Sequence, residues 1–473
     1  MTALSSSSVV VAPEPQHRVR TVWVRVVLWA AAVLALAEPA FRYRIVNRDE
    51  ATIATVARAA DAGRTLYQGI VDRKPPLVFE LAQLVGAHDL RVMRALGLLA
   101  VALTAVVSSR IGRLLGYANP LHQHVLVAIA AVALFPLEDG MAAGFELFAL
   151  PTLALVLYGC LRGNPVAVGV CGALAVMTKQ TALFPVGAAV LVAGRRWGPG
   201  FVGRATGIGA VVALVVSSRY PPMDLFRWTF LDGSGYLGGV TAASLVRDSL
   251  PALLRMLVAM VPVSALAWRA GGRREPEVVA MAIGAVISIL PGLRLAPHYA
   301  LFLLVPLLPA CTAGAFSRPL TRVHAGAATA LAVMAVIHQV PALNPSTESF
   351  DELGAAVRSI TDPAQEIFVW GQVSTVYWQS DRLPATSFPT TGFATGHGLA
   401  RRPAGPLRSH TTPLWGRLQR ELRRAAPPVL VDTSGSLGVP HPSILESPLN
   451  GWVREHYLPY RVVQGAVIWI RVD

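Results

Sequence analysis

Residues 145–161 read FELFALPTLALVLYGCL, an apolar run that is followed at once by Arg162. A bilayer crossing takes about 17 to 25 mostly apolar residues. Inside lipid only a helix satisfies its own backbone polar groups within one segment. The run therefore predicts a membrane-spanning helix, with Glu146 at its start and Arg162 just after its end.

Runs of this kind recur along the chain. Of its 473 residues, 53% are hydrophobic and only 14% are charged, whereas a soluble domain carries about 25% charged residues. The mean hydropathy is +0.51. We predict an α-helical polytopic membrane protein with about eleven transmembrane helices, at 23–40, 90–109, 121–137, 145–161, 165–178, 180–194, 201–218, 249–268, 278–293, 298–316 and 323–340. The short crossings 165–178 and 180–194 could instead form one broken or re-entrant pair.

Arginines mark the breaks after the even-numbered crossings. These breaks hold Arg110, Arg113, Arg162, Arg195, Arg196, Arg204, Arg269, Arg273, Arg274, Arg318 and Arg322. Cytoplasmic loops carry such an excess of basic residues. The pattern predicts a multi-pass protein of the plasma membrane with a cytoplasmic N-terminus and an extracytoplasmic C-terminus. The net charge of +14 thus reports orientation, and we expect no nucleic-acid partner.

This topology divides the chain into three parts. Residues 1–22 form a Ser/Pro-rich, disordered cytoplasmic N-terminus, and 23–340 form the transmembrane part. Its first extracytoplasmic loop, 41–89, contains interfacial helices. Residues 341–473 form an extracytoplasmic soluble domain. The apolar run 26–38 also fits a signal peptide, but a retained first helix explains the later topology equally well.

The composition changes sharply in the tail. Residues 366–370, 428–431 and 465–470 read as short buried strands, and 351–359 fits a short amphipathic helix. A small α/β domain is predicted there. The three cysteines lie in apolar runs outside the tail, so the tail has no disulfide or zinc site. They are Cys160, Cys171 and Cys311.

An acidic pair begins the first loop. Residues 47–50 read Asn-Arg-Asp-Glu, and apolar residues then recur at helical spacing. Asp49 and Glu50 would lie in the first turn of that helix, where carboxylates interact favourably with the helix dipole. The spacing alone fits an ordinary helix start as well as a catalytic pair.

Basic residues follow in the same loop. Residues 72–76 read Asp-Arg-Lys-Pro-Pro, and the two prolines restrain Lys74 in an extended chain. A lysine held there can bind a phosphate as a point charge. The competing interpretation is ordinary contact of Arg73 and Lys74 with lipid headgroups.

Further charged residues fall on the same side of the predicted membrane. Lys179 interrupts two apolar runs, and a charge at membrane depth is costly, which makes it a functional candidate; it could also snorkel to the interface. Glu146 begins one crossing, while Arg294 and the pair His298-Tyr299 lie between two others. A histidine at the end of a crossing is as often a structural hydrogen-bonding residue.

Acids and bases therefore gather on one face. A carboxylate can accept the proton of an acceptor hydroxyl as that oxygen attacks an anomeric carbon. Cations can stabilise the charge that develops on a departing phosphate. The combination suits transfer of a sugar from a lipid-phosphate carrier.

At these residues the sequence resembles membrane glycosyltransferases of the GT-C type, of the branch containing protein O-mannosyltransferases and the lipid A aminoarabinose transferase. The matching pieces, which span about 40–300, are Asn47-Arg-Asp-Glu50, Leu66-Tyr67, Asp72-Arg-Lys-Pro-Pro-Leu77, Gly144-Phe-Glu-Leu-Phe148, Thr178-Lys-Gln180 and His298-Tyr299; Val369-Trp-Gly371 followed by Tyr377 is similar to tails of this group. One departure is Arg73, because the lipid A enzyme has an acid before its Lys-Pro-Pro lysine.

The resemblance implies a glycosyltransferase that uses a polyprenyl-phosphate-linked sugar, inverts the anomeric centre and acts outside the membrane. Asp49 would be the general base. Lys74, with Lys179, His298 and Arg294, would bind the donor phosphate, and supporting residues would be Glu50, Arg73, Glu146 and Tyr299. The acceptor would be a glycan, lipid or protein. Some members of the group bind a divalent metal, but this sequence shows no cluster with convincing ligand spacing, so we assign no metal ligand and leave a cofactor open.

Two other functions fit the composition. A transporter or flippase of a lipid-linked or anionic substrate would place its polar groups near the bilayer midplane, often in two related halves. A non-catalytic scaffold of cell-envelope glycan assembly would use the tail as a binding module. The charges at one face favour the enzyme.

Overall fold

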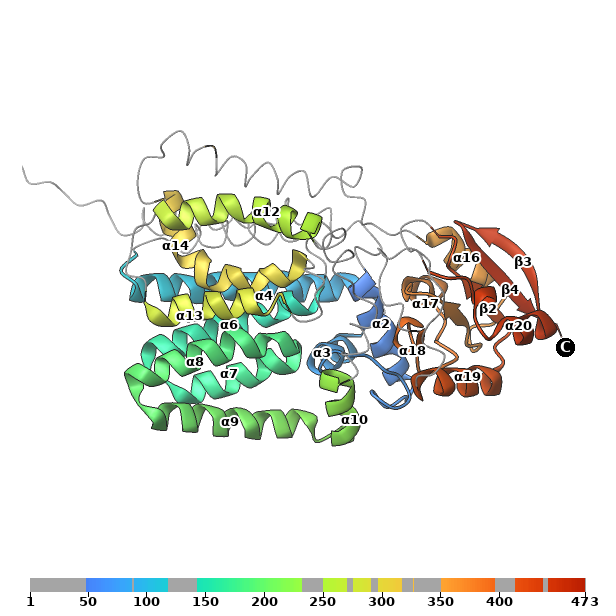
Figure 1. Cartoon of the computed structure of the whole chain (residues 1–473), viewed down its shortest axis with the longest axis horizontal. Coiled ribbons are helices and arrows are strands. Elements are labelled where there is room, and N and C mark those ends of the chain that lie inside the picture. Colours follow the sequence, from blue (N-terminus) through green and yellow to red (C-terminus); the bar gives the residue numbers. More distant parts are fainter. Residues whose placement is uncertain are drawn as a thin grey trace, which may run out of the picture.

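The computed structural model of the chain describes residues 48–86, 89–117, 143–231, 250–269, 275–290, 297–316, 326, 350–395, 413–436 and 441–472. Long helices lie side by side in one bundle (Figure 1). They are α4 (Leu90–Leu114), α6 (Phe145–Arg162), α7 (Pro165–Thr178), α8 (Leu183–Trp197), α9 (Pro199–Ser217), α12 (Leu250–Arg269), α13 (Pro276–Ile287) and α14 (Leu304–Phe316).

The length and apolar composition of several helices in the bundle suit a membrane. Of the described helices, α4, α6 and α9 are long and apolar enough to cross a bilayer, and α7, α13 and the segment His298–Ala313 are shorter apolar helices. On α9, Leu214 and Val215 are about 70% exposed, as expected for side chains that face lipid. The total of eleven crossings stays a prediction. Those at 23–40 and 121–137 lie outside the described residues, as does 323–340 apart from residue 326.

Small residues let the helices approach closely. A Cβ atom added to Gly169 of α7 would lie 2.6 Å from the carbonyl oxygen of Ala205 on α9, and one on Gly284 of α13 would lie 2.5 Å from that of Phe184 on α8. Close backbone approach through small residues is typical of helices packed in a membrane. The predicted pair around Lys179 forms two helices, α7 and α8, joined by the short 3-10 turn η1 (Gln180–Ala182).

Helices of the first loop lie at one end of the bundle, between it and the C-terminal region (Figure 1). They are α2 (Arg48–Asp61) and α3 (Leu77–Val85). Asp49 and Glu50 occupy the first turn of α2, as predicted. From there α2 is buried on all sides over residues 50–57. The turn α10 (Pro222–Phe226) and the π-helical turn η2 (Arg227–Leu231) lie at the same end.

The C-terminal region, residues 350–472, contains a four-stranded sheet in the order β1-β2-β4-β3. The three predicted strands are confirmed as β1 (Phe368–Trp370), β2 (Val429–Asp432) and β4 (Ala466–Arg471), and the predicted helix as α16 (Asp351–Ser359). β1 and β2 are parallel, and β4 is antiparallel to both β2 and β3. The same region contains the helices α17 (Thr375–Ser380), α18 (Gly392–Thr395), α19 (Pro413–Ala425) and α20 (Asn450–His456) and the turn η7 (Ile444–Glu446), and α17 and α18 lie on the side that faces α2 (Figure 1).

One strand of the sheet was not predicted from the sequence. β3 (Tyr457–Val463) lies at the edge of the sheet, and all its residues between the two ends are exposed. Its pairing with β4 shifts register between Pro459 and Arg461. A proline and continuous exposure suit an edge strand but remove the alternating pattern from which a strand is predicted.

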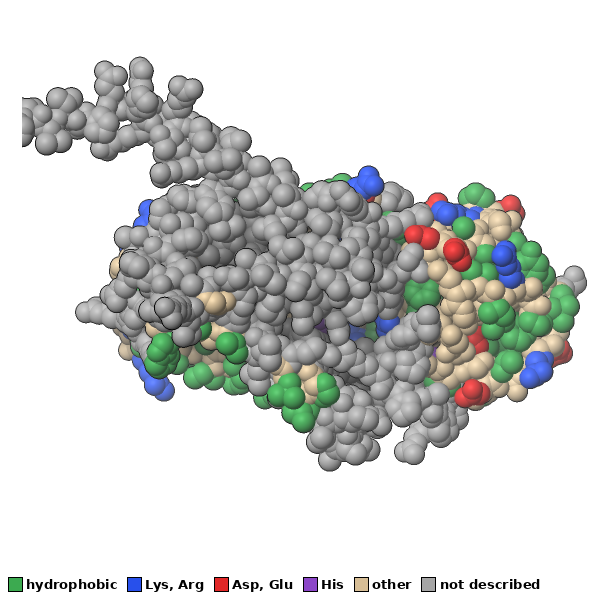
Figure 2. All heavy atoms as spheres, turned by 90° about the horizontal axis from the view of Figure 1, so that it is seen from above, with side chains coloured by type: hydrophobic (Ala, Val, Ile, Leu, Met, Phe, Trp, Pro, Cys, Tyr) green, Lys and Arg blue, Asp and Glu red, His purple; other side chains and the backbone are tan. Residues whose placement is uncertain are grey.

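The C-terminal region packs directly on the first loop. Thr52 Oγ1 of α2 lies 2.7 Å from Ser374 Oγ, and Arg58 of α2 lies 2.5 Å from Asp381. Phe368 and Trp370 of β1 belong to the same buried cluster as the apolar face of α2. Seen from above, charged side chains are scattered over the C-terminal region, while hydrophobic ones predominate on the described part of the bundle (Figure 2).

Candidate active site

The site is organised around the first turn of α2. Asp49 Oδ1 lies 3.8 Å from Lys74 Nζ, and the two side chains are 30% and 14% exposed. Both groups are therefore partly open to solvent. The acidic residue Asp49 and the basic residue Lys74, both predicted from the same loop, thus lie side by side.

Lys74 is held from several directions. Its backbone N–H donates to Asp72 Oδ1 at 2.9 Å, and its carbonyl accepts from the Tyr67 hydroxyl at 2.9 Å. Its ammonium lies 3.9 Å from the buried Asp72 carboxylate and 4.6 Å from the centre of the Phe145 ring. Asp72 and Tyr67 thus position a lysine whose charge still faces Asp49.

A second ionic group lies behind this pair, where α6 begins and α7 ends. Lys179 Nζ lies 2.6 Å from Glu146 Oε1, and both side chains are almost wholly buried. The ammonium also lies 4.9 Å from the centre of the Tyr299 ring, and that ring packs edge-on against His298. His298 Nε2 is 3.9 Å from Glu146 Oε1, and its side chain is 22% exposed.

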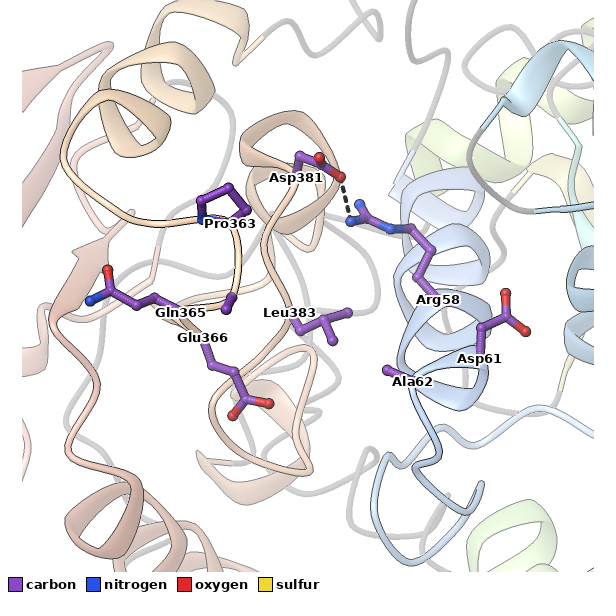
Figure 3. Close-up of a pocket in the computed structure, with 9 residues that line it drawn as sticks. Arg58, Asp61, Ala62, Pro363, Gln365, Glu366, Asp381 and Leu383 are labelled. Carbon is purple, nitrogen blue, oxygen red and sulfur yellow. Dashed lines mark hydrogen bonds and ion pairs between the residues drawn. The ribbon is translucent and has the colours of Figure 1, made fainter.

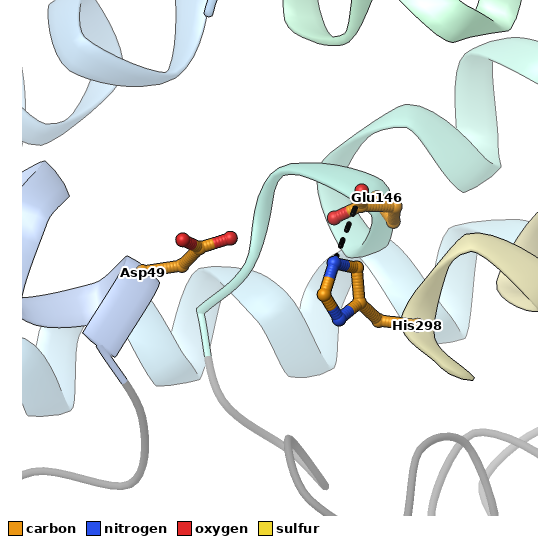
Figure 4. Close-up of side chains that lie close together, drawn as sticks. All are labelled: Asp49, Glu146 and His298. Carbon is orange, nitrogen blue, oxygen red and sulfur yellow. Dashed lines mark ion pairs between the residues drawn. The ribbon is translucent and has the colours of Figure 1, made fainter. Parts of the chain in front are cut away.

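Three of these groups converge in a way that the sequence did not reveal. Asp49, Glu146 and His298 each offer one ligand atom, and these atoms lie within 4.8 Å of one another (Figure 4). Two carboxylates and an imidazole suit a divalent cation. Ligand atoms of a tetrahedral zinc ion lie about 3.4 Å apart, so these three side chains would have to move closer together to hold one. Lys179 already compensates the charge of Glu146, so an ion would compete with its ammonium.

The pKa of Asp49 follows from these neighbours. Burial raises it, but the charges of Lys74, His298, Lys179 and Arg73 outweigh burial and lower the pKa from 3.8 to about 2. Asp49 is therefore ionised at any physiological pH and can accept hydrogen bonds. A bound phosphate would neutralise part of that positive field and make the carboxylate more basic.

Glu50 turns the other way and has a structural role that the sequence left open. It accepts hydrogen bonds of 2.8 Å from both Nε and Nη2 of Arg94 on α4. It also accepts one of 2.8 Å from the backbone N–H of Ala143, just before α6. Arg94 and Glu50 are 1% and 0% exposed. The pair fixes the first turn of α2 to two helices of the bundle.

Sequence reasoning missed Arg94. The available signal was a charge near the start of the apolar run 90–109, since such a charge is costly in a membrane unless it is paired. Of the other expected site residues, Arg73 lies with its guanidinium 5.1 Å from the centre of the Phe393 ring, and its carbonyl accepts from Gln180 at 3.1 Å. Arg294 lies outside the described residues.

Comparison with solved structures identifies a protein with the same fold. No family model and no curated protein matches the sequence. Among solved structures, the chain is similar to ArnT from Cupriavidus metallidurans in the apo state, with a TM-score of 0.59 and 15% identity over 96% of this chain and 98% of ArnT. It is also similar to the arabinofuranosyltransferase AftD from Mycobacteria, with a TM-score of 0.48 and 16% identity over 94% of this chain and 40% of AftD. Both are GT-C membrane glycosyltransferases. At this identity the likeness to ArnT shows a shared fold, as the resemblance of the motifs implied.

Proposed function

We propose that this chain is an integral membrane glycosyltransferase. It transfers a sugar from a polyprenyl-phosphate donor to an acceptor hydroxyl on the extracytoplasmic face, with inversion at the anomeric carbon. The observation that carries the proposal is the partly exposed pair of Asp49 and Lys74, whose charged atoms lie 3.8 Å apart. One group can take a proton while the other holds a phosphate.

Asp49 and Lys74 have separate roles in the proposed reaction. The acceptor oxygen attacks the anomeric carbon and forms the new glycosidic bond, and Asp49 takes the proton of that hydroxyl. The bond from the anomeric carbon to the phosphate oxygen breaks, and the electron pair leaves with the polyprenyl phosphate. Lys74 stabilises the charge on that leaving group. His298, which is partly exposed nearby, is a second candidate for phosphate contact.

The buried groups have supporting roles in this proposal. Lys179 is only 3% exposed, and its ammonium neutralises the charge of the Glu146 carboxylate. It therefore acts on the phosphate by long-range electrostatic attraction and not by direct contact. Glu50 and Arg94 hold Asp49 in place through the first turn of α2. If a divalent ion binds, Asp49, Glu146 and His298 would hold it, and it would add positive charge near the leaving phosphate.

The low pKa of Asp49 has to rise before this residue can act as an effective base. A carboxylate with a pKa of about 2 is a weak base, and a catalytic base works best with a pKa near the working pH. Binding of a negatively charged donor phosphate beside Lys74 offsets the cation that depresses the pKa. Asp49 therefore becomes a better base when the donor is in place.

A transfer assay tests the proposal. The purified full-length chain in detergent is incubated with polyprenyl-phosphate mannose or decaprenyl-phosphate arabinose, with a lipid or glycan acceptor, and released polyprenyl phosphate is measured by mass spectrometry. We expect release that depends on the protein and produces a glycoside of inverted configuration. A transporter or a scaffold would bind the donor without cleaving it, and that result across several donors would overturn the proposal.

A further inference from the structure

A short segment that follows α9 has two contrasting faces. It consists of α10 and η2, which together run from Pro222 to Leu231. In Figure 1 α10 lies crosswise to α9, at the end of the bundle where α2 and α3 also lie. The segment is therefore placed where the chain leaves the bundle, next to the candidate site.

One face of the segment is buried against the site and the C-terminal region. Trp228 is 3% exposed and packs edge-on against the ring of Phe388. The carbonyl of Thr229 accepts a hydrogen bond from the side-chain amide of Gln180 at 3.4 Å, and the same amide donates to the carbonyl of Arg73 at 3.1 Å. These contacts connect the segment to the loop of the candidate phosphate-binding lysine.

The opposite face exposes large apolar side chains at helical spacing. Met223 is 73% exposed, and Phe226, Phe230 and Leu231 are each about half exposed. The ring centres of Phe226 and Phe230 lie 5.5 Å apart, so the two side chains form one continuous surface. An exposed apolar surface of this kind marks a contact with a partner or with a membrane.

The level of the segment relative to a bilayer follows from α9. This helix has 19 residues, which corresponds to a length of about 28 Å and is close to the hydrocarbon thickness of about 30 Å. Its last turns expose Leu214 and Val215, and the exposed Arg219 comes next. The apolar face of the segment therefore begins where the lipid-facing surface of α9 ends, at the level of the lipid headgroups.

The composition of the exposed face identifies lipid as its partner. Phenylalanine, methionine and leucine side chains alternate with two exposed basic residues, Arg219 and Arg227. Segments with this division lie in the membrane interface, with the apolar side chains among the acyl chains and the basic ones near the phosphates. The edge strand β3 exposes Leu458 and Tyr460 to a similar degree, but it lies on the side of the sheet far from the bundle (Figure 1).

We propose that residues 222–231 form a membrane-surface anchor, whose exposed face inserts into the lipid leaflet on the side of the candidate site. Acyl chains of bilayer lipids cover Met223, Phe226 and Phe230. Because the buried face is hydrogen-bonded to the site through Gln180, the anchor holds the loop of Lys74 at the bilayer surface. The inference concerns contact with lipid and does not depend on the transfer of a sugar.

Nitroxide labels measure this insertion in the full-length protein, reconstituted into vesicles of phosphatidylethanolamine and phosphatidylglycerol. Met223→Cys and Phe230→Cys are labelled in a protein whose three native cysteines are replaced by alanine. Val215→Cys on α9 is the lipid-facing reference. Leu458→Cys on β3 is the matched control, since Leu458 is an apolar side chain that is 55% exposed. Electron paramagnetic resonance then compares collisions of each label with O₂ and with a water-soluble nickel chelate.

We expect the labels at 223 and 230 to favour O₂, as the label at 215 does, and to lie about 5–10 Å below the lipid phosphates. The label at 458 should favour the nickel chelate. A water-exposed response at 223 and 230, or shielding of both from both reagents by protein, would overturn the inference. A lipid response that appears only after polyprenyl phosphate is added would also overturn it, because the surface would then hold the donor tail and not the bilayer.

A second measurement keeps the native cysteines. Phe226 and Tyr460 are each about half exposed, and each is replaced in turn by photoreactive p-benzoylphenylalanine, which retains an aromatic ring. After irradiation of the vesicles, mass spectrometry should find lipid adducts of the variant at 226 and none of the variant at 460. Equal adduct yields at the two positions would contradict the anchor. Neither measurement involves a sugar, so failure of the anchor and failure of the proposed function are separate results.

Discussion

The Arg94 guanidinium holds the Glu50 carboxylate through two hydrogen bonds of 2.8 Å in a site that excludes solvent almost completely. The same carboxylate accepts from the backbone of Ala143. Three segments far apart in the sequence thus meet at one residue beside Asp49. The pair gives the first turn of α2 a fixed position relative to α4 and α6.

Removing one partner of this pair is expected to be costly. Arg94→Met leaves a buried carboxylate without its cation and should destabilise the protein by about 3–5 kcal/mol. The double variant Glu50→Met with Arg94→Met should recover much of that stability, because no charge stays buried, but not the transfer rate, because Asp49 is no longer anchored. The unfolding midpoint in detergent and the transfer rate are measured together.

Arg91→Met is the matched control, since Arg91 is exposed on the first turn of α4. It should leave both quantities unchanged. Recovery of full activity in the double variant would show that the pair does not position Asp49.

The sequence predicts much of this arrangement but not its contacts. Apolar runs predict the helices, and α6 and α7 begin within a residue of their expected positions, because length and hydropathy are local properties. The partnership of Glu50 and Arg94 depends on how α2 packs against α4, which no local pattern encodes. The same is true of the convergence of Asp49, Glu146 and His298 from three separate segments.

Lys74 should control the affinity for the donor. Lys74→Gln removes the partly exposed ammonium next to Asp49 and should raise the donor KM by about tenfold to a hundredfold, the range for a hydrogen bond to a charged group. The donor KM of Lys74→Arg should lie between that of the wild type and that of Lys74→Gln. Initial rates at varied donor concentration measure the effect, with Arg461→Gln on the exposed edge of the sheet as the control. An unchanged donor KM in Lys74→Gln would place the phosphate elsewhere.

The depressed pKa of Asp49 predicts a pH dependence of stability. The folded pKa of about 2 lies below the ordinary 3.8, so the ionised carboxylate contributes stability that is complete well above pH 4. That contribution is lost as the pH falls through about 4 toward 2. The unfolding midpoint of the wild type, relative to that of Asp49→Asn, should fall as the pH drops below about 4. A difference that stays constant from about pH 5 down to about pH 2 would mean that the pKa of Asp49 is not depressed.

Lys179 should compete with a divalent ion at Glu146. Its ammonium lies 2.6 Å from Glu146 Oε1, where it compensates one of the three candidate ligands. Lys179→Met should therefore increase the affinity for Mn²⁺, by about tenfold or more for loss of a close like charge. Electron paramagnetic resonance of the purified protein measures free Mn²⁺. Adding His298→Ala should reverse the gain, and a gain that survives this change would locate the ion away from the three residues.

In the C-terminal region the strands can be predicted from the sequence, but the contacts with the first loop cannot. Its buried strands β1, β2 and β4 are short continuous apolar runs and are readily recognised. Whether residues 341–473 form a separate domain is a question of contacts, and Phe368 and Trp370 pack in one cluster with α2 of the first loop. A cavity at that junction, between Arg58 and Ala62 on one side and Pro363 and Leu383 on the other (Figure 3), has walls from two distant segments, so no motif could reveal it.

Single-turnover transfer by Asp49→Asn tests the central claim most directly. The purified variant, loaded with polyprenyl-phosphate sugar and mixed with acceptor, is compared with the wild type and with Glu352→Gln, which changes an exposed carboxylate of α16. We expect Asp49→Asn to bind the donor and to keep its fold but to transfer the sugar about a hundredfold to ten-thousandfold more slowly, while Glu352→Gln transfers normally. Transfer by Asp49→Asn at the rate of the wild type would contradict the assignment of Asp49 as the base.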